Sequence, residues 1–238
     1  MSFLSGIKTK VLNLVFPLSC AGCGAQDMHL CAPCAAAIPM YAPACFVCKK
    51  LVPAHGVLSA GRTCTPCRKK SCIYAFFSPF SYGHPAIRSL LHNLKYRRMH
   101  SIAPILGNLV VTSLAFYRVA LPKDTLLIPV PLHPSRERMR GFNQSLLITK
   151  VVGENLGIST RGDLLKKVKK TRPQMKLTRE ERLRNVLDVF SVSDTDAIYH
   201  KTCILMDDIK TTGATLESAA RALKRAGAKK IFVITVAR

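Results

Sequence analysis

Residues 203–215 constrain the possible fold of this chain more than any other segment. An apolar run there ends in two adjacent carboxylates, Asp207 and Asp208, and a Thr/Gly turn follows them. Beyond the turn, apolar residues recur from Leu216 to Ala226 with the spacing of one helix face. In open α/β sheets, ligands bind just beyond the carboxyl ends of the strands. The segment therefore predicts a strand, a ligand-binding turn and a helix N-terminus in direct succession.

The chemistry of this turn suits a sugar phosphate. Carboxylates at a strand end can accept hydrogen bonds from sugar hydroxyls, and backbone N–H groups at a helix N-terminus suit a phosphate. A glycine in the turn lets the backbone approach a ligand closely or take a positive φ. The predicted phosphate-binding residues are Lys210, Thr211, Thr212, Gly213, Ala214 and Thr215. The alternative is an ordinary strand–turn–helix with two solvated acids.

This pattern resembles the ribose-phosphate signature of the type I phosphoribosyltransferases, in which a hydrophobic strand leads into two acids and Thr-Thr-Gly-x-Thr. The resemblance implies that Asp207 and Asp208 hold the ribose hydroxyls of phosphoribosyl pyrophosphate, while the turn holds its 5′-phosphate. Lys210 stands where that family usually carries an apolar residue. We expect this lysine to add a phosphate contact.

Eight of the ten cysteines form Cys-x-x-Cys pairs. The pairs are Cys20/Cys23, Cys31/Cys34, Cys45/Cys48 and Cys64/Cys67. A tight turn aims two thiolates at one tetrahedral ion, and two such turns complete a four-cysteine zinc site. The four pairs therefore predict two Zn2+ ions. Disulfides and a redox pair are the weaker alternatives, because no βαβ pattern surrounds these cysteines and the chain is expected in a reducing compartment.

The pairing of these turns stays open at the level of sequence. Sequential pairing of the first with the second and the third with the fourth needs the smallest loops, while an interleaved cross-brace is the alternative. His29 and His55 lie near the pairs but are expected to be bystanders. Cys203 falls within the predicted strand and should behave as a small apolar residue.

The charge balance of the chain is strongly basic. Lys and Arg number 36 against 13 acids, which gives a formal net charge of +23 over 238 residues. Such a surface attracts polyanions, including nucleic acid, phosphorylated small molecules and an acidic membrane face. No run approaches the roughly eighteen consecutive apolar residues of a membrane span, and residues 1–16 fit a short amphipathic helix rather than a signal peptide. We therefore expect a cytoplasmic protein, with the inner face of the membrane as a further location open to it.

The chain divides into two regions of different character. Residues 1–72 are rich in turns, as in a small module stapled by metal, whereas residues 73–238 alternate strand and helix patterns. Strands that alternate with helices predict a parallel α/β sheet. The expected strands are 73–81, 126–130, 202–206 and 231–236, and the expected helices are 84–96, 102–119, 144–156 and the one from 216.

Further candidate ligands follow another predicted strand and close a helix. The segment Val130, Pro131, Leu132 and His133 should form a loop at the same edge of the sheet as the two acids. Arg136, Arg138 and Arg140 follow, and guanidinium groups match the oxygens of a pyrophosphate. Asn143 and Gln144 can orient a ligand or the loop itself. Lys95 closes the 84–96 helix, where it either faces the pyrophosphate or merely complements the helix dipole.

These segments together resemble the ComF family, which joins a zinc-ribbon N-terminus to a phosphoribosyltransferase domain. The motifs are the four cysteine pairs, Leu94-Lys95-Tyr96, Pro129-Val130-Pro131-Leu132-His133, Arg140-Gly141-Phe142-Asn143-Gln144, Thr171-x-x-Gln174, Arg182-x-x-Asn185 and residues 207–215. The resemblance implies a type I phosphoribosyltransferase-like parallel sheet flanked by helices, a double zinc-ribbon module, and a role in natural competence and DNA uptake. It also implies phosphoribosyl pyrophosphate and Mg2+ as ligands, with Asp207, Asp208, Arg140 and Lys95 as the catalytic group.

Three functions remain open at this stage. The first is a Mg2+-dependent phosphoribosyltransferase or phosphoribosyl pyrophosphate binder, for which no acceptor site is evident. The second is single-stranded DNA binding through the zinc ribbons and the basic segment 161–184, although aromatic residues make up only 7% of the chain and no Trp is available for base stacking. The third is a zinc-ribbon scaffold that recruits competence or recombination proteins.

Overall fold

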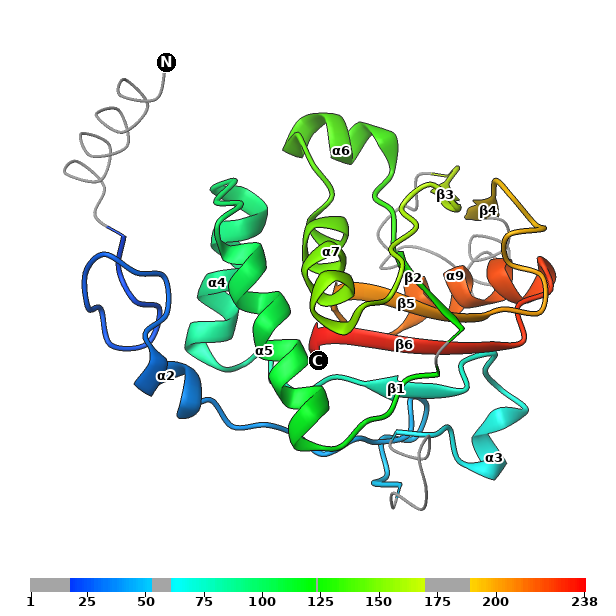
Figure 1. The fold of residues 1–238 in the computed structure, drawn as a ribbon, viewed down its shortest axis with the longest axis horizontal. Coiled ribbons are helices and arrows are strands. Elements are labelled where there is room, and N and C mark those ends of the chain that lie inside the picture. The colour runs from blue at the N-terminus through cyan, green and yellow to red at the C-terminus, as the bar shows by residue number, and fades with distance from the viewer. Residues whose placement is uncertain (1–17, 53–60, 123, 170–188) are drawn as a thin grey trace, which may run out of the picture.

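Four parallel strands form the central sheet of the computed structural model (Figure 1). Their order is β1 (Ala75–Phe77), β6 (Lys230–Ala237), β5 (Thr202–Ile209) and β2 (Thr125–Pro129). The structure describes residues 18–52, 61–122, 124–169 and 189–238. The expected N-terminal helix, His55 and the motif residues Thr171, Gln174, Arg182 and Asn185 lie outside these residues.

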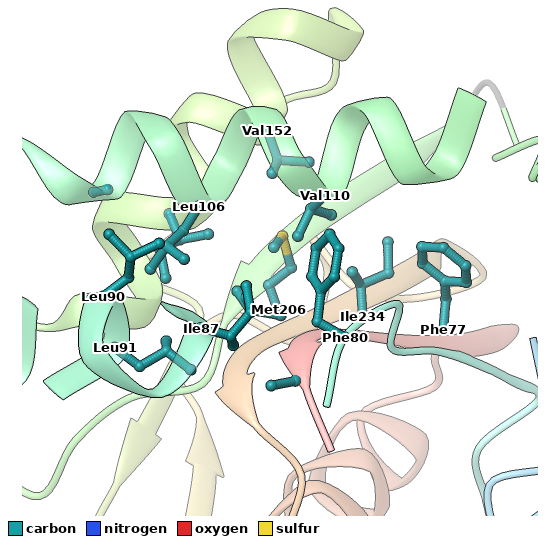
Figure 2. Packing of buried hydrophobic residues seen from close by; sticks show 14 of the residues in the cluster. Phe77, Phe80, Ile87, Leu90, Leu91, Leu106, Val110, Val152, Met206 and Ile234 are labelled. Atoms are coloured by element: carbon teal, nitrogen blue, oxygen red, sulfur yellow. The ribbon is translucent and has the colours of Figure 1, made fainter. Parts of the chain in front are cut away.

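Helices cover both faces of the sheet, because alternate residues of its strands are apolar on each side. Phe232 and Ile234 of β6 face a cluster that contains residues of α4 (Pro85–Tyr96), α5 (Ile102–Phe116) and α7 (Gln144–Leu156). Figure 2 shows this cluster from close by. Ile231 and Val233 face the opposite cluster, which is built with α9 (Ala214–Arg225). Strands buried on both faces in this way are typical of parallel α/β proteins.

The expected helices agree with the structure to within a few residues. The 84–96 prediction corresponds to α4, whose first residue is Pro85, and the 144–156 prediction matches α7. Asn143 caps α7 by accepting a hydrogen bond from the Ser145 N–H, and Gly157 ends the helix with a φ of 65°. These are the residue types that favour helix ends. The predicted parallel sheet flanked by helices is confirmed.

Several element boundaries differ from the predictions. Strand β1 has three residues, whereas a strand was expected over 73–81. Strand β5 does not end before the two acids but continues to Ile209, because β6 runs alongside it and Ile209 pairs with Ala237. Residues 134–140, for which no helix or strand was expected, form helix α6 (Pro134–Arg140). The antiparallel pair of β3 (Leu165–Lys167) and β4 (Phe190–Val192) was not predicted.

The cysteine-rich region packs directly on the sheet and its helices. It contains two short helices, α2 (Ala32–Ala36) and α3 (Thr65–Arg68). The Thr63 N–H donates to the Tyr74 carbonyl, and the Phe76 N–H donates to the Gly61 carbonyl, so residues 61–63 run along the outer edge of β1. His29 Nε2 lies 2.7 Å from Ser101 Oγ. The expected boundary between residues 72 and 73 stays a prediction.

Within the described ranges, no helix combines the length and the apolar character needed to cross a bilayer.

Candidate functional site

Asp207 lies in β5 near its carboxyl end, beside the first turn of α7. Its Oδ1 accepts hydrogen bonds from Ser145 Oγ at 2.7 Å and from the Asp208 N–H at 2.9 Å. The side chain is half-buried. Burial, followed by the like charge of Asp208, raises the pKa of Asp207 to about 8. The carboxyl group therefore holds its proton at neutral pH unless a cation replaces that proton.

Asp208 is more deeply buried, with 4% of its surface exposed. Its Oδ1 accepts a hydrogen bond from Gln144 Nε2 at 3.3 Å, and its Oδ2 forms an ion pair with Lys95 Nζ. Lys95 lies in the last turn of α4. Its ammonium group is the counter-ion of the buried Asp208 carboxylate. From the sequence, Lys95 could either face a ligand or only complement the helix dipole. In the structure its ammonium group is paired with Asp208.

Arg140 joins the same network from the last turn of α6. Its guanidinium group donates to Gln144 Oε1 and lies 5.7 Å from the centroid of the Tyr96 ring. Gln144 therefore connects Arg140 to Asp208, and four elements contribute to one polar cluster. The cluster consists of Lys95, Tyr96, Arg140, Gln144, Ser145, Asp207 and Asp208. In contrast, Arg136 and Arg138 are exposed on α6.

The 130–133 segment lies at the same edge of the sheet as the acids. The Val130 N–H donates to the Met206 carbonyl at 2.8 Å, which extends the pairing of β2 with β5 past Pro129. Asn143 Nδ2 donates to the Val130 carbonyl at 3.1 Å and so ties the segment to the start of α7. His133 caps α6, and its Nδ1 accepts from the Ser135 N–H at 3.2 Å. The structure thus brings the segment beside Asp207 and Asp208, as expected from the sequence.

The turn after β5 leads into α9 through Gly213. This glycine has a φ of +85°, and a Cβ atom there would lie 2.7 Å from Cζ of Phe46. Thr211, Thr212 and Thr215 are exposed around it, so their hydroxyls are open to a ligand. The positive φ and the contact with Phe46 both require glycine here. An exposed turn that opens a helix is suited to a phosphate group.

Lys210 is buried, unlike the exposed threonines of the turn. Its N–H donates to the Ala237 carbonyl and is thus part of the sheet. Its side chain is buried, and the ammonium group lies over the rings of Phe46 and Phe76, at 4.8 Å and 5.5 Å from their centroids. The expected extra phosphate contact from Lys210 stays a prediction.

Eight thiols gather into two groups of four, each with all its sulfur atoms within 4.8 Å of one another. The groups are Cys20, Cys23, Cys31 and Cys34, and Cys45, Cys48, Cys64 and Cys67. Sequential pairing of the turns is therefore observed, and the interleaved cross-brace is not. His29 belongs to neither group. Cys203 is buried in β5, as predicted, and burial raises the pKa of its thiol to about 11.

The geometry of each group fits a zinc ion. The Sγ atoms of Cys20 and Cys31 are 3.6 Å apart, and those of Cys48 and Cys64 are 3.7 Å apart. Four sulfurs about 2.3 Å from one tetrahedral ion would be about 3.8 Å from each other. Backbone N–H groups of Cys23 and Cys31 lower the pKa of Cys20 to about 6, whereas hydrogen bonding to Cys31 raises the pKa of Cys34 to about 12. Closely packed thiols share protons in this way, and a divalent cation would replace those protons.

Two contributors to the site were not identified from the sequence. Ser145 binds Asp207, and its only signal was its position beside Gln144 at a helix start. Phe46, within the third cysteine pair, packs against Gly213 and Lys210 and so places the second thiol group directly beside the turn. Nothing in the sequence around Phe46 indicated a contact with a residue more than 160 positions away.

Comparison with known proteins assigns this architecture to a family. Residues 158–238 match the phosphoribosyl transferase domain family. The chain is 30% identical over 206 residues to DNA utilization protein YhgH of Salmonella typhi, covering 86% of this chain and 88% of that protein. It is 28% identical over 227 residues to competence protein F of Haemophilus influenzae, covering 92% of this chain and 90% of that protein.

A solved structure of glutamine phosphoribosylpyrophosphate amidotransferase from B. subtilis also matches, with 19% identity and a TM-score of 0.39. The match covers 57% of this chain and 26% of that one. The extended similarity to YhgH and competence protein F, the phosphoribosyl transferase domain and the two four-cysteine groups agree with each other. The chain belongs to the ComF family of DNA utilization and competence proteins.

Proposed function

We propose that this protein binds phosphoribosyl pyrophosphate together with Mg2+ at the carboxyl edge of β5. The observation that carries the proposal is the succession of Asp207, Asp208 and an exposed Thr/Gly turn that opens α9, within a chain segment that matches the phosphoribosyl transferase domain. The carboxylates would hold the ribose hydroxyls. The 5′-phosphate would lie against the N–H groups and hydroxyls of residues 211–215.

The donor set of the two acids fits a hard divalent cation. Mg2+ prefers carboxylate oxygens and usually keeps several of its waters. Asp207 is half-buried and carries a raised pKa because it is desolvated beside a second acid. A cation bound there would displace the proton and relieve the repulsion. When bound, Mg2+ would neutralise charge on the pyrophosphate group.

The remaining cluster residues are suited to the leaving pyrophosphate. Transfer of a phosphoribosyl group breaks the bond between C1 and the pyrophosphate oxygen, and negative charge accumulates on the leaving group. Arg140 is positioned for this charge by Gln144 and by the Tyr96 ring. Lys95 would exchange its ion pair with Asp208 for a contact with the pyrophosphate, or share the two. The 130–133 segment would supply backbone groups beside them.

Isothermal titration calorimetry on the full chain tests this proposal. Wild type should bind phosphoribosyl pyrophosphate with Mg2+ and much more weakly with EDTA present. The double variant Asp207→Asn/Asp208→Asn should lose the part of the phosphoribosyl pyrophosphate binding that depends on Mg2+. Asp163→Asn is the matched control, because this exposed acid pairs with Arg161 and has no contact with the polar cluster among the described residues. Mg2+-independent binding, or binding that survives the double substitution, would contradict the proposal.

We also propose that each four-cysteine group holds one Zn2+ ion. Each group offers four thiols at separations that suit zinc, and it contains no other type of metal ligand. Four protein ligands leave no open position on the ion, as in structural zinc sites. The ions would add to folding stability, because such a site does not exist in the unfolded chain.

A second candidate function is binding of single-stranded DNA, in line with the names of the relatives. Exposed cations surround the candidate site on the ends of α4 and α6. They are Arg97, Arg98, Arg136 and Arg138. We expect these groups to contact phosphates rather than read bases, so affinity should fall steeply with salt. A mobility-shift assay at roughly 50 mM salt tests this: Arg136→Gln/Arg138→Gln should weaken the shift, and no shift by wild type would contradict the idea.

A further inference from the structure

The ends of α4 and α6 meet at the outer rim of the polar cluster. The Arg98 guanidinium group donates to the Met139 carbonyl at 2.8 Å. Just beyond these helix ends, the rings of His100 and Phe142 pack edge to face, with their centroids 4.3 Å apart. Two independent contacts therefore hold the ends of the helices beside each other.

Large apolar side chains are exposed where the two helices meet. Tyr96 is 67% exposed and Met139 is 71% exposed, which places both among the three most exposed large apolar side chains in the described part of the chain. Single exposed apolar side chains are common and need no explanation. Here two of them stand on helix ends that are held together, so folding of this chain leaves an apolar face in water beside the cluster.

The Tyr96 ring is held in position although it is exposed. The centroid of the His92 ring, one helical turn earlier, lies 4.8 Å from that of Tyr96. The Arg140 guanidinium group lies 5.7 Å from the Tyr96 centroid, and Gln144 accepts a hydrogen bond from the same group. A ring that is already held loses little conformational entropy when a planar partner stacks on it.

The charged side chains around this ring are mostly positive. The exposed cations on the two helix ends are Arg97, Arg98, Arg136 and Arg138. One exposed acid, Glu137, lies among them on α6. An exposed ring among guanidinium groups fits a ligand in which planar groups alternate with phosphates.

We propose that Tyr96 stacks on a base of single-stranded DNA, while the surrounding arginines contact phosphates of the same strand. The proposal rests on the second candidate function above and names the residue that holds a base. Such stacking tolerates any sequence, because every base has a π-face. A duplex does not fit, because its bases are paired and stacked on one another and cannot reach the ring without leaving the helix.

Two oligonucleotides of equal length separate stacking from phosphate contacts. One carries thymine at every position, and the other is abasic and keeps only the sugars and phosphates. Fluorescence anisotropy with the zinc-loaded full chain at roughly 50 mM salt measures both affinities. Wild type should bind the thymine strand about tenfold more tightly than the abasic strand.

Substitutions at Tyr96 assign this preference to the ring. Tyr96→Leu keeps an apolar side chain without the ring and should bind both strands equally. Tyr96→Phe keeps the ring and should retain the preference. Equal binding of the two strands by wild type, or a preference that survives Tyr96→Leu, would overturn the proposal.

Tyr199→Leu is the matched control for Tyr96→Leu. Tyr199 is 61% exposed and lies against the ring of His200. It comes shortly before β5 begins and is therefore at the opposite end of that strand from the two acids. The preference for the thymine strand should be unchanged in this variant, and its loss there would contradict the assignment to Tyr96.

Photocrosslinking locates the base directly. A thymine strand that carries 5-iodouracil should crosslink under ultraviolet light to the peptide that contains Tyr96, as identified by mass spectrometry. Crosslinks confined to other peptides would overturn the proposal.

This proposal and the earlier ones fail in different ways. Arg136→Gln/Arg138→Gln should weaken binding of both strands and leave the ratio of their affinities unchanged. Asp207→Asn/Asp208→Asn should lose phosphoribosyl pyrophosphate binding but retain the preference for the thymine strand, and loss of that preference would place the base at the acids instead. If wild type binds neither strand, the second candidate function itself is wrong, whereas equal binding of both strands contradicts only the stacking.

Discussion

At the scale of single residues, the two adjacent acids are chemically different. Asp208 is paired with Lys95 and Gln144, whereas Asp207 receives hydrogen bonds from Ser145 and the Asp208 N–H but has no cation bonded to it among the described residues. The sequence shows two equivalent carboxylates. Their different partners come from α4 and α7, which only folding brings to β5.

The raised pKa of Asp207 predicts a pH dependence of stability. The folded protein keeps this proton up to about pH 8, whereas the unfolded chain releases it near pH 4. The contribution to stability is therefore complete below about pH 4 and is lost as the pH rises through 8. Urea denaturation of zinc-loaded protein without Mg2+ between pH 5 and 8 should show wild type losing stability relative to Asp207→Asn. A constant difference between the two proteins would show that Asp207 ionises normally.

Removal of Lys95 should destabilise the protein by leaving Asp208 charged, buried and without its cation. The Lys95 and Asp208 side chains are only 16% and 6% exposed. Breaking such a pair from one side costs about 3 kcal/mol. Lys95→Met should show this loss in chemical denaturation, and adding Asp208→Asn should restore most of it. If the double variant is as unstable as Lys95→Met, the ion pair is not the cause.

At the scale of elements, the site depends on the exact path of the chain between β5 and α9. Strand β5 continues through both acids because β6 offers backbone partners as far as Ala237. The sequence predicted that the strand ends earlier, since carboxylates are poor strand formers. It predicted no helix where α6 forms, because Arg136, Arg138 and Arg140 gave no apolar face to recognise.

Gly213→Ala tests the fit between the turn and the Cys45–Cys48 segment. Alanine would be strained at a φ of +85° and would also meet Phe46 at 2.7 Å. We expect a loss of about 2–3 kcal/mol in unfolding free energy and weaker phosphoribosyl pyrophosphate binding. Gly157→Ala is the matched control, with a φ of +65° and nothing within 4 Å, and should cost about 1 kcal/mol.

A second variant separates the two causes at Gly213. Phe46→Leu shortens the side chain that a new Cβ would meet. It should recover part of the stability in the Gly213→Ala background. If Gly213→Ala lowers the unfolding free energy by no more than Gly157→Ala does, the contact with Phe46 does not restrict the residue at position 213.

At the scale of the whole molecule, the cysteine-rich region and the sheet form one packed unit. The second thiol group reaches the turn through Phe46, and Glu217 of α9 accepts hydrogen bonds from Ser71 Oγ and the Cys72 N–H. Loss of metal should therefore disturb the candidate site as well as the N-terminal region.

Metal analysis should find two zinc ions per chain, one for each thiol group. Cys34→Ser and Cys45→Ser should each leave one ion and lower the melting temperature. Cys45→Ser should also weaken phosphoribosyl pyrophosphate binding, because its thiol group lies beside the turn. Cys72→Ser, outside both groups, should retain two ions. A wild-type content of one ion or none would contradict the assignment.

The sequence by itself determined the local features: four Cys-x-x-Cys turns, a strand that leads into two acids and a Thr/Gly turn, and the alternation of strands with helices. These depend on residues close together in the chain, where spacing and residue type are informative. The tertiary structure decided which turns share a metal, which acid Lys95 neutralises, and that Phe46 and Lys210 meet beneath the turn. Such contacts join residues far apart in the chain, and they follow from packing of the whole sheet, helices and cysteine turns rather than from any local pattern.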